Sequence, residues 1–293
     1  MNWKKVKNVL IIIFLIINGI LGYMNYQRKV QAFTLTSHQE NNIKRLLYSN
    51  NIMLYTLLPQ KYPSMKKLIL EPKSVSGEEE KKILKLIFGD VEDITVYLES
   101  ISKNRMQTVY SKGARKLSFS EGRIVYEEDI NSKPKTIGSK EESKNLADKF
   151  LKSLGYQLSE LEWDFKDEGN GQYKYLYYEV YKGNLIYDSY IEFVIKPQGI
   201  EKVDIYRMKP VRYIELSRSI YAPDEILFGF MNQVKRETNP GDIIIIQKVD
   251  IGYLISPKGE GVKEEEAIPH YRITLADGRY YHINAYNNEI FLN

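Results

Sequence analysis

The sequence contains no cysteine, and this absence excludes several kinds of chemistry at once. Without thiols the chain can form no disulfide, no zinc site with thiolate ligands, no thiol nucleophile and no lipid-modified cysteine. Histidine is also scarce, with three residues in the chain: His38, His270 and His282. His270 and His282 could face each other across a turn at residues 276–278, but no third ligand follows at a suitable spacing, and lone strand histidines usually lie on the surface. We therefore predict no metal site and no cofactor.

Catalytic motifs are missing as well. No Gly-x-Ser-x-Gly elbow occurs in the sequence. Glycine-flanked turns at 169–171 and 259–261 have no Walker lysine and no following helix. Acidic runs at 127–129 and 264–266 are typical of solvated loops rather than of glycosidase carboxylates. Because no nucleophile stands with a base, we predict that the chain has no catalytic residues and is not an enzyme.

Outside the N-terminal segment, the chain has nearly equal numbers of basic and acidic residues. Lys4, Lys5 and Lys7 are three of its 42 basic residues, which leaves 39 basic residues against 38 acidic ones. A nearly neutral domain has no electrostatic reason to bind nucleic acid. We therefore predict no nucleic-acid partner.

The most informative absence is a run of 20 residues, 8–27, without a single charge. As a helix it would extend about 30 Å, the thickness of a bilayer's hydrocarbon core. Lys4, Lys5 and Lys7 precede it and predict that residues 1–7 stay in the cytoplasm, with the C-terminal part outside the cell membrane. A cleaved signal peptide is the alternative. Its only small-residue cleavage site lies at 30–32, beyond two charged residues, so we expect an uncleaved anchor.

Three residues of this span are unusual for a plain anchor: Asn18, Gly19 and Gly22. Asn18 and Gly22 lie four apart on one helical face, and Gly19 lies beside them. Small residues allow helix backbones to approach, and an amide can donate across a helix pair. These residues therefore predict a partner-contacting face. The alternative is that polar atoms are simply tolerated near the outer interface.

An internal repeat organises the rest of the chain. Capping patterns at 76–79 and 139–142, and an Ala-Pro-Asp start at 222–224, each precede one apolar helical stripe. Turn residues and alternating apolar positions follow, which predicts antiparallel strands. The 24 tyrosines cluster in these alternating runs and are typical of strands with one half-wet face. The predicted repeat is one helix packed across its own antiparallel sheet.

These patterns predict an α+β fold, with an N-terminal transmembrane helix and repeated helix-on-sheet units. A polar segment at 129–138 separates a first domain, 33–137, from a second, 139–293. The second contains two similar units, 139–210 and 222–293. In the first domain we expect a helix at 37–48 and edge strands at 52–58 and 67–70.

The N-terminus carries a family resemblance. A short basic stretch with Trp3, followed by an Ile/Leu-rich span containing Asn18, resembles the start of the YycI proteins of low-GC Gram-positive bacteria. A helix over 40–50, a strand over 51–55 and the segment 68–72 are similar in layout to that family. The unit that ends with the Asp277-Gly278 turn and the strand after it resembles PepSY-type modules, which are extracytoplasmic and non-catalytic.

The resemblance implies a regulatory role and no catalytic residue. YycI-like proteins, with the related YycH, associate with the WalK (YycG) sensor histidine kinase and alter its activity, and hence cell-wall metabolism. It also implies that the membrane helix takes part in that contact, and that a YycH-like partner joins it. Two other functions stay open: a cell-envelope binding module that uses exposed tyrosines, and a PepSY-like protease inhibitor or chaperone.

Overall fold

The structure, a computed structural model, describes residues 3–31, 33–90, 92–102, 105–239, 241–256 and 264–292. The chain forms two compact units, and each combines distant segments of the sequence. The terminal unit contains residues 1–65, 217–250 and 271–293. The central unit contains residues 66–216 and 251–270. The linear division predicted from the sequence, 33–137 and 139–293, groups the residues differently and stays a prediction.

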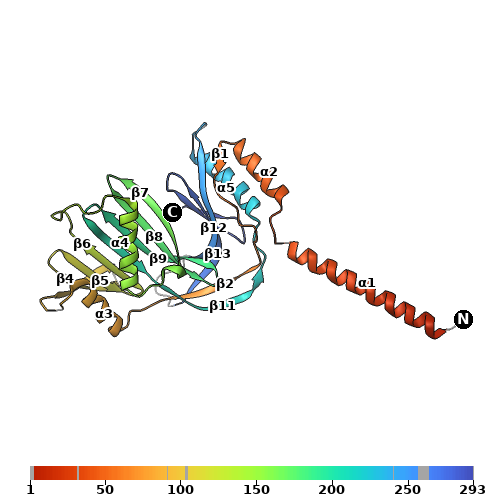
Figure 1. The fold of residues 1–293 in the computed structure, drawn as a ribbon, viewed down its shortest axis with the longest axis horizontal. Helices are drawn as coiled ribbons and strands as arrows, with labels where there is room; N and C mark the ends of the chain where they lie inside the picture. Colours follow the sequence, from red (N-terminus) through yellow and green to blue (C-terminus); the bar gives the residue numbers. More distant parts are fainter. Residues whose placement is uncertain are drawn as a thin grey trace. The chain divides into compact units, whose positions relative to one another are not determined.

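The terminal unit begins with the long helix α1 (Trp3–Gln31). Its other elements are α2 (Ser37–Tyr48), β1 (Ile52–Leu54), α5 (Pro223–Glu237), β14 (Tyr280–Asn284), β15 (Ile290–Leu292) and parts of β12 (Ile244–Ile255) and β13 (Glu265–Leu275). Helices α2 and α5 lie side by side (Figure 1), and Lys235 Nζ donates to Asn50 Oδ1 at 2.6 Å. The apolar stripe predicted for α5 is buried: Ile226, Leu227, Phe230, Met231 and Val234.

The central unit is a sheet with helices packed on it. The strands follow the order β11-β2-β13-β12-β9-β10-β6-β5-β4-β3, and β8 pairs with both β9 and β7. Their bounds are β2 (Met65–Pro72), β3 (Thr95–Ser102), β4 (Arg105–Lys112), β5 (Arg115–Ser120), β6 (Arg123–Glu128), β7 (Leu161–Gly169), β8 (Gln172–Tyr181), β9 (Asn184–Lys196), β10 (Gly199–Tyr206) and β11 (Met208–Arg218). The helices are α3 (Gly77–Phe88), α4 (Lys140–Ser153) and a 3-10 turn at Leu158–Glu160.

Strand pairing is mainly antiparallel, as expected, but parallel pairs also occur among the described residues. In the central unit Gly252 of β12 stands opposite Leu185 of β9. In the terminal unit Ile52 of β1 stands opposite Ile244 of β12. Parallel neighbouring strands need a long crossover connection. Both of these parallel pairs accordingly join strands that are distant in the sequence. The α+β class is confirmed, with a mixed rather than purely antiparallel sheet.

The predicted helix starts are confirmed, because their signals are local. The Ser76 hydroxyl accepts from Glu79 N at the start of α3, and the Ser139 hydroxyl accepts from Glu142 N at the start of α4, each at 3.2 Å. Helix α5 has no hydroxyl cap. Instead Ala222 N donates to Glu225 Oε2 at 2.9 Å.

Helices α3 and α4, which begin two different repeats, share one hydrophobic core. Ile83 and Ile87 of α3 and Ala147 and Leu151 of α4 are buried in the same cluster as residues from β5, β6, β8, β9 and β10. Helix α4 crosses the face of the sheet near β7 and β8 (Figure 1). The first two repeats therefore bury their apolar faces together, which explains why neither forms a compact unit alone.

Tyrosine has a different role from the half-wet strand residue that we expected. Tyr175, Tyr177, Tyr271 and Tyr281 are among the largest fully buried side chains. Two of these hydroxyls bond to helix side chains: Tyr177 donates to Asp148 of α4, and Tyr281 donates to Glu237 of α5, each at 2.8 Å. The Tyr271 hydroxyl donates instead to Tyr221 O, in the segment before α5. The tyrosine-rich strands therefore attach each helix to its sheet.

Candidate functional site

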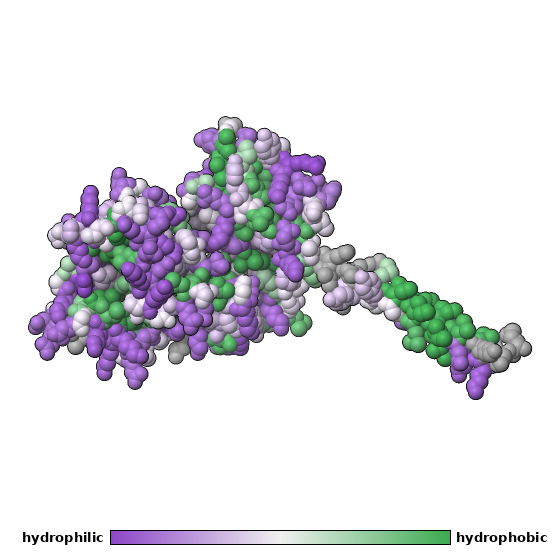
Figure 2. All heavy atoms as spheres, in the orientation of Figure 1, coloured by the Kyte–Doolittle hydropathy of each residue, from purple (hydrophilic) through white to green (hydrophobic). Residues whose placement is uncertain are grey.

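Helix α1 provides the candidate functional surface, because its exposed side chains are mainly apolar. Within it, the 21 residues Val6–Tyr26 are long and apolar enough to cross a membrane. At 1.5 Å per residue they extend about 31 Å. All side chains of residues 7–26 are exposed, and Figure 2 shows an apolar surface along the middle of α1, with more polar residues toward its two ends. A face this apolar is stable in lipid or against another apolar helix, and not in water.

Aromatic residues mark both ends of this span. Trp3 lies at one end, and Tyr23 and Tyr26 lie at the other. Trp3 and Tyr23 are 20 residues apart, or about 30 Å along a helix. Amphipathic rings favour the two interfaces of a bilayer, so this spacing fits a helix that crosses it once.

The predicted contact face is open along α1. Gly19 and Gly22 have no heavy atom within 4 Å of where a Cβ would lie, outside the helix's own backbone. The Asn18 side chain donates from Nδ2 to Phe14 O at 2.8 Å, within the same helix. That bond satisfies one amide hydrogen inside lipid, and it leaves the amide oxygen able to accept from a partner helix.

The predicted topology signals lie in the first turns of α1. Lys4 and Lys7 are exposed, whereas the side chain of Lys5 lies outside the described residues. Their position before the apolar run is suitable for the cytoplasmic side of a span. The orientation itself stays a prediction.

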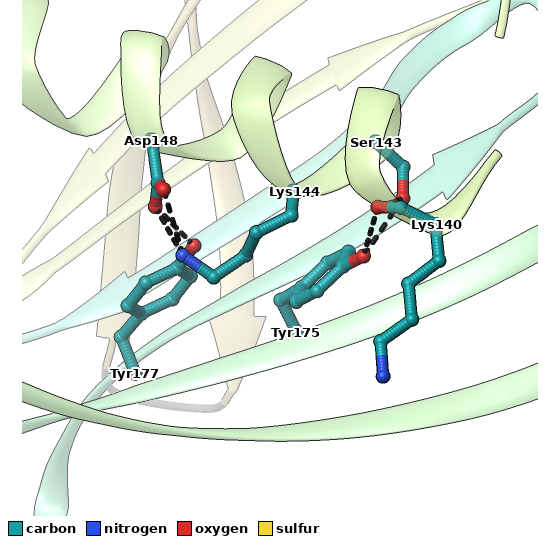
Figure 3. A network of polar contacts seen from close by, with 6 residues as sticks. All are labelled: Lys140, Ser143, Lys144, Asp148, Tyr175 and Tyr177. Carbon is teal, nitrogen blue, oxygen red and sulfur yellow. Dashed lines mark hydrogen bonds and ion pairs between the residues drawn. The ribbon is translucent and has the colours of Figure 1, made fainter.

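A cluster of polar side chains joins α4 to β8 in the central unit (Figure 3). The Tyr175 hydroxyl donates to Lys140 O at 2.9 Å and lies 2.7 Å from the Ser143 hydroxyl. Lys144 Nζ contacts both oxygens of Asp148, at 2.6 and 2.7 Å, and Asp148 also accepts from Tyr177. Burial and the neighbouring Asp148 carboxylate raise the pKa of Tyr177, so its hydroxyl stays protonated and donates.

The aromatic rings beside this cluster are covered by lysines. Lys140 Nζ lies 3.8 Å from the centroid of the Phe165 ring, and Lys144 Nζ lies 4.6 Å from that of Trp163. Such contacts are favourable when partly desolvated. The cluster therefore holds α4 on β7 and β8. Its charged groups already pair with one another, which favours a structural role over a catalytic one.

The strand histidines are buried, contrary to the expectation of surface residues. His270 lies in β13, and its Nδ1 is 3.0 Å from Ile268 O. Burial lowers the pKa of His270, which favours a neutral ring. His282 in β14 is also buried and packs against Tyr280. Across the described ranges, no group of three or more His, Asp or Glu side chains is placed to hold a metal ion.

The two acidic runs that we interpreted as loops lie mainly in strands. Glu266 of β13 pairs with Lys67 of β2 at 3.0 Å. Glu128 of β6 pairs with Arg115 and Lys133, each at 2.8 Å. The partners come from neighbouring strands and from the segment after β6, so the run alone could not reveal them.

Comparison with known proteins identifies the family. A family model described as "YycI protein" matches residues 31–286. No curated protein matches the chain. Among solved structures, an uncharacterised protein from Eubacterium rectale ATCC 33656 is similar with a TM-score of 0.56 at 13% identity, over 83% of this chain and 90% of that one. This likeness concerns the fold alone.

A second solved structure is the Bacillus megaterium YpeB C-terminal domain. Its TM-score is 0.42 at 12% identity, over 75% of this chain and 99% of that one. The family model covers most of the chain. The chain therefore belongs to the YycI family.

Proposed function

We propose that this chain is a single-pass membrane protein that regulates a sensor histidine kinase of the WalK (YycG) type, and through it cell-wall metabolism. The observation that carries the proposal is the family match over residues 31–286, joined to one apolar helix long enough to span a membrane. The YycI family is a family of regulatory accessory proteins and not a known enzyme family. A YycH-like protein is the expected second partner.

The contact would be made by α1, through the face that contains Asn18, Gly19 and Gly22. The two glycines allow close approach of a kinase helix, and the free Asn18 oxygen can accept from it. Such a helix shifts the kinase between signalling states only when it binds those states with unequal affinity. The extracytoplasmic units would then determine when α1 is available, by their own contacts.

Exchange of the span tests this proposal. One chimaera places residues 1–32 on an unrelated extracytoplasmic domain, and the reciprocal chimaera places an unrelated span before residues 33–293. Each is co-expressed with the kinase and purified from detergent-solubilised membranes. We expect the first chimaera to co-purify with the kinase and the second to lose most of the association. The reverse pattern would place the contact in the extracytoplasmic part and contradict a role for α1.

A second candidate function, a cell-envelope binding module, has one observation in its favour. Tyr48 and Tyr55 are 68% and 73% exposed, so their rings are free to stack on a glycan. Retention of the detergent-solubilised protein on purified peptidoglycan would support it. The Tyr48→Ala/Tyr55→Ala protein should then be released, whereas Leu57→Ala, at a similarly exposed apolar neighbour, should be retained. No retention of the parent protein counts against this function.

A further inference from the structure

Arg207, between β10 and β11, is a buried cation with unused donors. It is 5% exposed, and its Nη1 donates to Glu79 Oε1. Its Nε and Nη2 atoms are fully buried and form no hydrogen bond of good geometry among the described residues, although the guanidinium interacts with the Tyr156 hydroxyl. Buried donors of this kind are rare, because leaving them unpaired costs free energy. A buried guanidinium edge without a well-formed hydrogen bond therefore points to a ligand.

The backbone holds this side chain in place. Arg207 N donates to Gly122 O at 2.8 Å, and Arg207 O accepts from Lys73 N at 2.9 Å. Arg207 is therefore fixed on both sides, by the turn between β5 and β6 and by the residue after β2. A group fixed in this way loses little further freedom when it binds a ligand.

Arg207 is one of the residues that line a cavity of about 350 Å³ in the central unit. This volume lies near the lower end of the range for small-molecule sites. Its apolar wall comes from Leu154, Leu161, Val180 and Ile186. Tyr156 also lines the cavity, and its buried hydroxyl interacts with the Arg207 guanidinium without forming a hydrogen bond of good geometry.

We propose that this cavity binds a carboxylate, with Nε and Nη2 of Arg207 as its two donors. These two atoms form one edge of the planar guanidinium, and their parallel N–H bonds match the two oxygens of a carboxylate. The Tyr156 hydroxyl is a candidate third donor. The apolar wall would accept a short hydrocarbon or an apolar amino-acid side chain attached to the carboxylate. This inference does not depend on the proposed regulation of a kinase.

The charges around the cavity disfavour a ligand with two negative charges. Glu79, Glu160 and Glu179 line it together with the cations Arg207 and Lys73. Glu79 already pairs with Arg207, and Glu179 accepts from Ser189 at 2.7 Å. A doubly charged phosphate would be repelled by these carboxylates more strongly than a monocarboxylate. The ligand chemistry is therefore a monocarboxylate, either as a free short-chain acid or as the C-terminus of a peptide.

Titration of the full-length protein in detergent tests the site. The probes are butyrate, inorganic phosphate, and an acetylated Gly-Leu dipeptide with a free or an amidated C-terminus. Binding is followed by the thermal unfolding midpoint and by the nitrogen-15 resonance of the arginine Nε–H groups. We expect saturable shifts with butyrate or with the free-acid peptide, and none with phosphate or the amidated peptide. Binding of butyrate but not of the peptide would identify the ligand as a free short-chain acid. Binding of the free-acid peptide but not of butyrate would identify it as a peptide C-terminus.

Arg207→Lys retains the charge and loses the two-donor edge. We expect it to weaken carboxylate binding about tenfold, since it removes a bidentate, charge-assisted contact. Arg212→Lys is the matched control, because Arg212 forms an exposed pair with Glu264. Equal binding by Arg207→Lys and the parent would overturn the proposal. So would an Nε–H resonance that no carboxylate shifts, which would leave ordered water as the occupant.

Discussion

The hydroxyl of Tyr177 in β8 donates to Asp148 Oδ1 across 2.8 Å, and this bond joins the strand to α4, the helix that begins the second repeat. The same relationship occurs in the other repeats. Tyr110 of β4 donates to Glu80 of α3, and Tyr281 of β14 donates to Glu237 of α5. A tyrosine to acid hydrogen bond therefore attaches each of the three repeat helices to a strand. These three tyrosines therefore have a structural role.

Removing one of these hydroxyls should loosen its helix. We expect Tyr177→Phe to lower the free energy of unfolding by about 1.5 kcal/mol, the lower end of the range for a hydrogen bond to a charged group. Tyr97→Phe, in the exposed strand β3, should change it by less than about 0.5 kcal/mol. Urea unfolding followed by Trp163 fluorescence in a Trp3→Phe background measures both variants. Equal effects of the two substitutions would show that the buried Tyr177 hydroxyl stabilises the fold no more than the exposed Tyr97 hydroxyl does.

The open face of α1 gives a prediction about the kinase contact. Gly22→Leu adds a large side chain beside Asn18, and we expect it to weaken co-purification of the kinase about tenfold. Ile20→Phe adds similar bulk on the opposite side of the helix, and it should leave the association unchanged. Quantitative co-purification from one detergent extract compares the two. Loss of association in both variants would mean that the contact is not confined to this face.

The basic residues before the span make topology testable. With Lys4, Lys5 and Lys7 all changed to Gln, the basic residues nearest the span are Arg28 and Lys29, on its other side. We expect a substantial inverted fraction, because positive charge favours the cytoplasmic side. The chain has no native cysteine, so a Leu57→Cys reporter and an impermeant maleimide read the orientation directly. Changing Lys81, Lys82 and Lys85 to Gln instead, far from the span, should leave the labelling unchanged.

Asp188 in β9 makes stability depend on pH. Burial raises the pKa of its carboxyl to about 6 from 3.8, although Ile255 N donates to it at 2.6 Å. Below about pH 4 the carboxyl is protonated in both the folded and the unfolded protein. As the pH rises from there through about 6, the free energy of unfolding decreases, because the unfolded protein loses this proton first. Asp188→Asn keeps an acceptor for Ile255 and avoids the buried charge. We expect it to be more stable than the parent at about pH 7.5, by at most about 3 kcal/mol.

Urea unfolding at several pH values checks this prediction. The difference between Asp188→Asn and the parent should close near pH 4, because both side chains are then neutral. Glu162→Gln removes an exposed carboxylate from β7, and its curve should run parallel to that of the parent. A constant difference across the pH range would mean that the Asp188 carboxyl does not titrate as its burial requires.

The features that were predictable from the sequence are those with local signals. Helix α2 has the bounds that were expected, because Thr36 and Gln39 form a capping box within four residues. Strands β3, β4 and β11 were not predicted. The burial of β13 was also missed, because β13 is covered by pairing with β2, a strand distant in the sequence. Ala267 of β13 stands opposite Leu68 of β2. The Arg207 cavity had no local signal either, since Glu79 lies 128 residues before Arg207.

Gly122 connects the fold to the Arg207 cavity and allows the sharpest mutational test. Its φ is +69°, and a Cβ there would lie 2.9 Å from Pro72 Cβ and 3.1 Å from Arg207 O. Gly113 has a similar φ of +60°, but no atom lies within 4 Å of its Cβ position. Gly113→Ala should therefore cost only the backbone strain, about 1 kcal/mol. Gly122→Ala should cost about 1–3 kcal/mol more, because neither neighbour is a flexible side-chain end.

The second consequence of Gly122→Ala separates packing from binding. Because Gly122 O accepts from Arg207 N, movement of this turn would displace the guanidinium from its cavity. We expect Gly122→Ala to weaken butyrate binding at a temperature where the protein remains folded, and Gly113→Ala to leave it unchanged. Urea unfolding gives the first effect, and the Nε–H titration gives the second. Equal losses of stability in the two variants would contradict the close contact at Gly122.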